Sequence, residues 1–95
     1  MNNVEVLDPE IVTEQKEETK DALVNKLVLW NDDVNPIDKV ILVLHTFFKM
    51  SAEDAIKKVL FIHENGKDSV MEGTIKEIEP YFLILVDNDL NATIE

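Results

Sequence analysis

The residues best suited to chemistry lie in two short segments, a loop and the end of a helix. Asn31, Asp32 and Asp33 follow a short apolar run, and His63 lies near the end of a predicted helix, one turn after Val59. An amide oxygen, carboxylates and a neutral imidazole nitrogen all accept hydrogen bonds, and the carboxylates add negative charge. Such a set suits a cationic group that carries several N–H donors.

Two simpler interpretations stay open for these residues. The loop can be a solvated turn in which Asx side chains bond their own backbone, and His63 can merely suit the partial negative charge at a helix C-terminus. A metal-dependent hydrolase built from Asp32, Asp33 and His63 is a further alternative, but the chain lacks a metal-ligand spacing such as a His pair on one helix. No serine lies in a nucleophile motif. We therefore expect no enzyme, no catalytic residue, no metal and no cofactor.

Composition excludes several classes of partner. The chain has 95 residues, enough for one domain, and 20 acidic residues against 9 Lys and Arg give it a formal net charge of −11. This balance argues against nucleic acid and against anionic membranes. The absence of cysteine excludes disulfides and Cys-ligated zinc. No segment resembles a signal peptide or a membrane span of about 18 apolar residues, so a cytoplasmic location is expected. We also expect the protein to be a monomer.

Composition also divides the chain in two. Residues 1–22 are rich in Asp and Glu and show no sustained apolar period, which predicts a flexible acidic N-terminal extension. Residues 23–95 are predicted to form the folded domain. Its expected elements, in chain order, are a strand at 27–30, helices at 36–49 and 51–65, a strand at 69–71, a helix after 74 and a strand at 90–94.

The order β-α-α-β-α-β predicts an α+β fold, with a three-stranded antiparallel sheet covered by three helices on one face. Asn35 is expected to cap the first helix, with Pro36 as its first helical residue. Thr74 and Glu77 have the spacing of a capping box. Pro80 costs ~3 kcal/mol inside a helix, so the regular part of the third helix is expected to start nearer Glu79.

Two motifs in this order resemble the ClpS family of protease adaptors. Residues 29–36 read LWNDDVNP, similar to the family's V-N-D-D-x-T-P-M at a strand-loop-helix junction. Residues 55–67 read AIKKVLFIHENGK, similar to the family's A-x-x-x-M-x-x-V-H-x-x-G-K. The resemblance runs from about residue 27 to 95 and implies the fold of the C-terminal domain of the ribosomal stalk protein.

The resemblance implies an adaptor that binds proteins bearing Leu, Phe, Tyr or Trp at a free N-terminus, called N-degrons. The adaptor then delivers them to the N-terminal domain of a Clp-family AAA+ unfoldase. Matching the motifs places the α-amino contacts on Asn31, Asp32 and His63, with Asp33 nearby. The matching residues of the apolar side-chain pocket are Ile37, Val40, Val59, Ile62 and Leu90.

The chain departs from the family pattern at the pocket. Asn35 replaces the usual Thr before the proline, and Ile37 and Val59 replace two methionines. Flexible thioether side chains are thereby replaced by stiffer β-branched ones. We expect this change to affect which N-terminal residues of a substrate the pocket accepts. The alternative function is a modulator that binds the unfoldase and changes its substrate choice without binding N-degrons.

Overall fold

The computed structural model describes residues 24–95, which form three strands and three helices. They are β1 (Asn25–Trp30), α2 (Ile37–Phe47), α3 (Ala52–Asn65), β2 (Lys67–Gly73), α4 (Ile75–Asp87) and β3 (Ala92–Ile94). This order confirms the predicted α+β class. The predicted extension at residues 1–22 lies outside the described residues.

The sheet is antiparallel, with β1 in the centre and strand order β2-β1-β3. Leu27 pairs with Met71 of β2 and with Ile94 of β3. The register against β2 shifts between Leu27 and Val28, so β2 is irregular there. Pairing along the whole of β1 makes β2 longer than the strand expected at 69–71.

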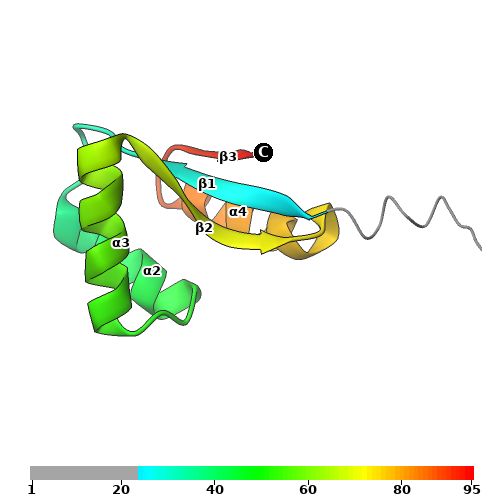
Figure 1. Ribbon diagram of the computed structural model, residues 1–95, viewed down its shortest axis with the longest axis horizontal. Coiled ribbons are helices and arrows are strands. Elements are labelled where there is room, and N and C mark those ends of the chain that lie inside the picture. The colour runs from blue at the N-terminus through cyan, green and yellow to red at the C-terminus, as the bar shows by residue number, and fades with distance from the viewer. Residues whose placement is uncertain (1–23) are drawn as a thin grey trace, which may run out of the picture.

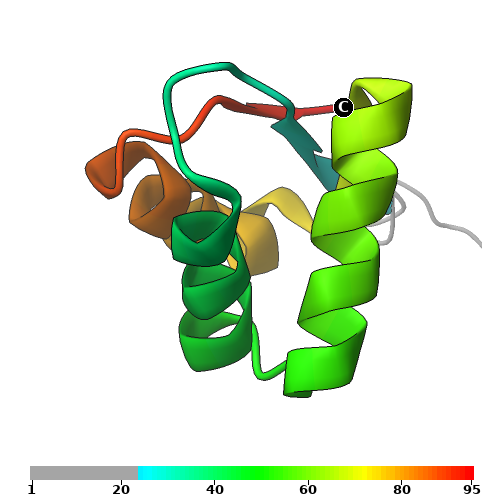
Figure 2. The ribbon, with the colours of Figure 1, turned by 90° about the vertical axis from the view of Figure 1, so that its left-hand side faces the viewer.

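The helices lie to one side of the sheet. In Figure 1, α4 runs behind the strands, and it contacts all of them. Figure 2 looks along the strands and shows α2 and α3 side by side at the end of the sheet nearer the viewer; α3 also contacts β2, and α2 contacts α4. This arrangement encloses one core. The buried core residues are Leu27, Leu29, Val43, Leu44, Ala55, Val59, Ile62, Ile78, Leu85 and Leu90.

Local signals fix the ends of α3 and α4. Ser51 Oγ accepts a hydrogen bond from the backbone N–H of Asp54 at 3.0 Å, and Gly66, with φ of 96°, ends α3 in the left-handed conformation that glycine adopts readily. The capping box of Thr74 and Glu77 is complete, with bonds of 2.9 and 3.2 Å. The caps therefore define both helix starts.

The expected late start of α4 is wrong. The helix begins at Ile75 and runs through Pro80 without interruption. The capping box satisfies the first N–H groups, and Ile78 and Leu85 are fully buried against the sheet. Packing of this apolar face offsets the hydrogen bond that the proline lacks.

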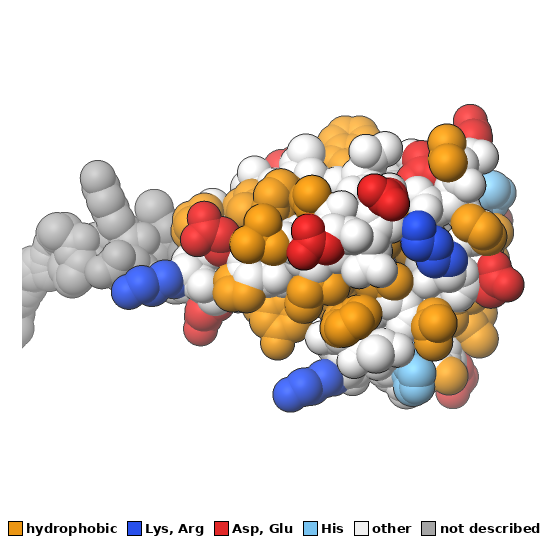
Figure 3. Space-filling view, turned by 180° about the vertical axis from the view of Figure 1, so that it is seen from behind, with side chains coloured by type: hydrophobic (Ala, Val, Ile, Leu, Met, Phe, Trp, Pro, Cys, Tyr) orange, Lys and Arg blue, Asp and Glu red, His pale blue; other side chains and the backbone are white. Residues whose placement is uncertain are grey.

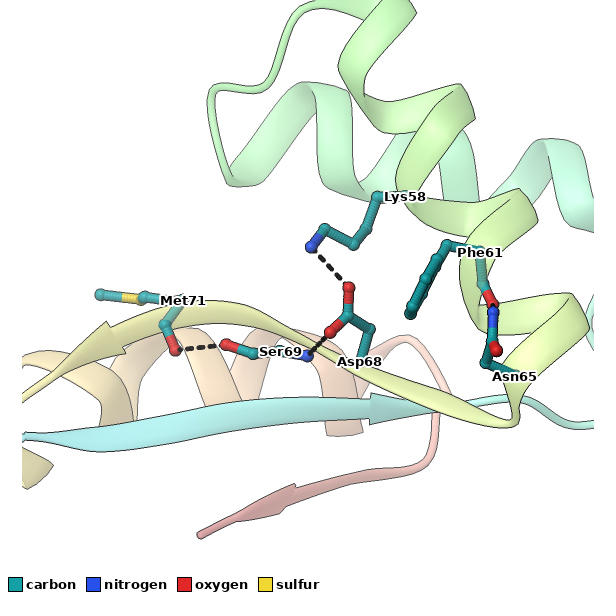
Figure 4. A network of polar contacts seen from close by, with 6 residues as sticks. All are labelled: Lys58, Phe61, Asn65, Asp68, Ser69 and Met71. Atoms are coloured by element: carbon teal, nitrogen blue, oxygen red, sulfur yellow. Dashed lines mark hydrogen bonds and ion pairs between the residues drawn. The ribbon is translucent and has the colours of Figure 1, made fainter.

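An ion pair ties α3 to the sheet. Lys58 Nζ lies 2.7 Å from Asp68 Oδ2, and Asp68 Oδ1 accepts a bond from the Ser69 N–H (Figure 4). The side chain of Asn65 donates to the Phe61 carbonyl at 2.9 Å in the last turn of α3. The Lys58–Asp68 ion pair therefore joins the middle of α3 to the start of β2, whereas the Asn65 bond lies within α3.

The face of the molecule opposite to the one seen in Figure 1 carries both acidic and apolar side chains. Figure 3 shows hydrophobic side chains there with Asp and Glu between them. On α4, Ile75, Leu83 and Val86 are 47, 52 and 44 % exposed. A surface of this composition agrees with the net charge of the sequence.

Candidate functional site

A cavity of about 300 Å³ opens between the loop that follows β1 and the helices α2 and α3. It is lined by Leu29, Trp30, Asn31, Asp32, Asp33, Asn35, Pro36, Ile37, Val40, Val59, Ile62, His63 and Leu90. All nine residues that the sequence analysis singled out are among these. Residues distant in sequence therefore share one site.

Backbone hydrogen bonds bring the loop to the end of α3. The N–H of Asn31 donates to the carbonyl of Gly66 at 2.8 Å, and the N–H of Trp30 donates to the carbonyl of Asn91 at 2.9 Å. Since Gly66 ends α3, the first bond places Asn31 beside the last helical turn, which carries His63. Figure 2 shows that the loop starts beside the upper end of α3 and arches above α2, descending to the start of that helix.

The floor of the cavity is apolar. Val59, Ile62 and Leu90 are each only 4 % exposed, and Leu29 is 1 % exposed. Ile37 is 39 % exposed and stands at the rim. A hollow of this size with buried walls can receive one large apolar side chain, and it falls at the lower end of the usual range of ligand pockets.

Asp32 organises the loop as well as lining the cavity. Its Oδ1 accepts hydrogen bonds from the backbone N–H groups of Val34 and Asn35, both at 2.8 Å. Its Oδ2 accepts one from Asn35 Nδ2 at 3.0 Å. The Asx turn that we considered as an alternative is thus present, and it holds a carboxylate at the edge of the cavity.

The same bonds keep Asp32 ionised. The backbone N–H of Asn35 is the largest influence that lowers the pKa of Asp32 below its ordinary value. Partial burial opposes this shift, while the Asn35 amide, the Val34 N–H and the charge of Lys39 reinforce it. Asp32 is therefore a carboxylate at neutral pH.

Asn35 does not cap α2, contrary to expectation. The helix has Pro36 at its N-cap and no side-chain cap bond. The Asn35 side chain instead donates to Asp32 and to the carbonyl of Asp89, and accepts from Lys39. Its polar groups are all engaged, with partners in the loop, in the turn that contains Asp89 and on α2.

The two histidines differ in their surroundings. His63 is exposed and lines the cavity, next to the buried Ile62. His45 lies away from the cavity, where its Nδ1 is 2.8 Å from the carbonyl of Met50. This contact joins the last turn of α2 to the segment that precedes α3.

Four lining residues were not predicted to belong to the site: Leu29, Trp30, Asn35 and Pro36. Trp30 Nε1 donates to Thr93 Oγ1 at 2.9 Å, and Lys67 Nζ lies 4.5 Å from the centre of its ring. The position of Leu29 and Trp30 at the end of β1, directly before the loop, is a signal that could have identified them.

Replacing Asp32 with Asn is expected to destabilise the fold more at about pH 7 than at about pH 3. The folded-state pKa of Asp32 lies below the unfolded value of about 3.9. Its stabilising contribution is therefore present above that value and is lost as the pH falls through the folded-state pKa. Urea unfolding of both proteins at the two pH values measures the difference.

The control for this experiment is Asp33→Asn, because no hydrogen bond joins the Asp33 carboxylate to another residue between 24 and 95. Its effect should be small at both pH values. A cost of Asp32→Asn that is unchanged between them would contradict the role assigned to the ionised carboxylate.

Within residues 24–95, no three His, Cys, Asp or Glu side chains are grouped so as to hold a metal ion. None of the helices in that range has the length and apolar character needed to cross a membrane.

Comparison with known proteins gives concordant matches. The family model described as ATP-dependent Clp protease adaptor protein ClpS matches residues 20–92. An adaptor named ClpS from Caulobacter vibrioides is 39 % identical over 56 residues, covering 59 % of this chain and 51 % of the relative. One from Zymomonas mobilis is 37 % identical over 59 residues, covering 62 % and 55 %. The chain spans about half the length of the curated relatives it matches.

A solved structure has the same fold. ClpS2 of Agrobacterium tumefaciens bound to L-phenylalaninamide superposes with a TM-score of 0.67 at 26 % sequence identity. The match covers 76 % of this chain and 94 % of that one. The names and descriptions of these proteins are those of an adaptor and not of an enzyme. The family model extends over most of the sequence, and the chain belongs to the ClpS family of ATP-dependent Clp protease adaptors.

Proposed function

We propose that this chain binds the free α-amino group and the bulky hydrophobic first side chain of N-degron proteins, and delivers them to a Clp-family AAA+ unfoldase. The observation that carries the proposal is that Asn31, Asp32 and His63 line the same cavity as a buried apolar floor. Polar acceptors and an apolar hollow are the two features that such a ligand requires.

The polar border fits a terminal ammonium group. An α-amino group has a pKa of about 7.7–8.0 and is mostly protonated at neutral pH, so it presents three N–H donors and a positive charge. Asn31 offers a carbonyl oxygen, Asp32 a carboxylate and His63 a ring nitrogen. Asp33, which also lines the cavity, adds a second negative charge.

The apolar floor fits the first side chain. Ile37, Val40, Val59, Ile62 and Leu90 line the cavity together with Leu29. Burying a Leu or Phe side chain contributes about 1.5–3 kcal/mol, and a hydrogen bond to a charged group about 1.5–3 kcal/mol. After the costs of association, an affinity in the low micromolar range, near −8 kcal/mol, is expected.

The Agrobacterium ClpS2 structure supports this assignment by the chemistry of its ligand. L-Phenylalaninamide combines a free α-amino group with a benzyl side chain. The family name supports a Clp protease as the partner. The binding of the unfoldase's N-terminal domain and the cytoplasmic location stay predictions for this chain.

A panel of peptides that differ only in the first residue tests the proposal. Peptides beginning with Phe or Leu are expected to bind at least about tenfold more tightly than one beginning with Ala, because the larger side chains fill the cavity. Fluorescence anisotropy or calorimetry measures the affinities, and Ile and Val at the first position report on the effect of Ile37 and Val59.

Equal affinity across the panel would contradict the proposal that the cavity binds the first side chain. An absence of binding to every peptide, with retained binding to the unfoldase, would favour the alternative, a modulator that changes substrate choice without holding N-degrons.

A further inference from the structure

The amide of Asn35 uses all its hydrogen-bonding groups in one network. Its Nδ2 donates to Asp32 Oδ2 and to the carbonyl of Asp89, both at 3.0 Å, and its Oδ1 accepts from Lys39 Nζ at 2.6 Å. An amide group has two N–H donors and a carbonyl acceptor. Asn35 thus joins α2, the loop and the turn between α4 and β3.

Lys39 fixes which way the amide faces. The ammonium group of Lys39 can only donate, so the atom next to it must be the amide oxygen. The amide nitrogen then necessarily faces Asp32 and Asp89, both of which present acceptors. A rotated amide would set a donor against Lys39 and an acceptor against the carboxylate.

This orientation determines the position of one carboxylate oxygen. Asp32 Oδ1 is occupied by the N–H groups of Val34 and Asn35, whereas Oδ2 accepts only the Asn35 amide among the described residues. Oδ2 therefore keeps capacity for a further donor. The Asn35 amide is the group that sets its direction at the border of the cavity.

The Asp89 end of the network reaches the cavity floor. Asp89 has φ of 63°, and its turn is held by a bond from its N–H to the carbonyl of Val86 at 2.9 Å. The next residue is Leu90, which is buried in the floor. Asn35 consequently links the turn that carries a floor residue to the carboxylate at the border.

We propose that Asn35 is a positioning residue, whose amide, oriented by Lys39 and anchored to the Asp89 carbonyl, holds Asp32 Oδ2 ready to accept a hydrogen bond from the substrate's terminal ammonium group. This inference rests on the proposed function. It concerns a residue at which this chain differs from the family motif, and Asn35 acts through Asp32 without itself receiving the amine.

A double-mutant cycle on the full chain tests the proposal. The affinity of a peptide with a free N-terminal Phe is measured for the wild type, Asn35→Ala, Asp32→Asn and the double variant. Asn35→Ala is expected to weaken binding about five- to tenfold in the wild-type background. In the Asp32→Asn background it should weaken binding less than about twofold, because the carboxylate that it positions is gone.

A control variant separates positioning from general loss of structure. Asn88→Ala also removes a side-chain bond to a backbone carbonyl, that of Ile84 at 2.8 Å, and lies beside the same turn but outside the cavity. It should change affinity less than about twofold. Thermal unfolding of all variants shows whether each one is folded at the temperature of the binding assay.

Each outcome decides between the hypotheses. Equal weakening by Asn35→Ala in both backgrounds, or none in the wild-type background, would overturn the positioning role while leaving the proposed function intact. If the wild-type protein fails to bind the peptide, the proposed function is contradicted, and so is this inference, which rests on it.

Discussion

Asp32→Asn is expected to weaken the binding of a peptide with a free N-terminal Phe by roughly 10- to 100-fold, the effect of losing a hydrogen bond to a charged group. The substitution keeps the size of the side chain but removes its negative charge. It also sets one amide nitrogen against another at the contact with Asn35 Nδ2. Calorimetry at neutral pH measures the change directly.

The control is Asp38→Asn, which changes the net charge by the same amount. Asp38 lies in the first turn of α2 and does not line the cavity. Its substitution should leave affinity within about twofold. Similar losses for the two variants would show that Asp32 acts only through the overall charge of the protein.

Leu44→Ala is expected to lower the free energy of unfolding by about 2–5 kcal/mol. Leu44 is fully buried in the core, where α2 packs against the rest of the domain. The whole stability of a small domain is about 5–15 kcal/mol. One such substitution therefore threatens the fold, and urea denaturation measures the loss.

The matched control lies on the same helix. Leu42→Ala removes the same atoms from a side chain that is 63 % exposed, and surface changes of this kind usually fall within about 0.5 kcal/mol. Comparable destabilisation by the two variants would contradict the core assigned to α2.

The sequence predicted the fold best where local signals and packing agree. Ser51 and Gly66 are turn and cap residues, and the helix between them has the bounds expected from its apolar period. The first part of α4, up to Pro80 in the helix interior, is harder to predict, because a proline normally interrupts a helix. Packing of Ile78 and Leu85 in the folded core helps the helix to continue through Pro80, and this packing is known only from the three-dimensional structure.

The cavity could be predicted residue by residue only through the family motifs. Periodicity placed Val59 and His63 on one helical face but did not place that face beside Asn31. The contact depends on a backbone bond from Asn31 to Gly66, residues 35 positions apart in the chain. The network of Asn35 could not be predicted either, because its partner carbonyl belongs to Asp89 in a turn that follows α4.

The most direct test of the account compares two peptides that begin with Phe, one with a free N-terminus and one that is acetylated. Acetylation removes the charge and two of the N–H donors and adds bulk to the group that we propose is held by Asn31, Asp32 and His63, which line one cavity. We expect micromolar binding of the free peptide and at least about 100-fold weaker binding of the acetylated one. Equal affinity for the two would contradict recognition of the α-amino group.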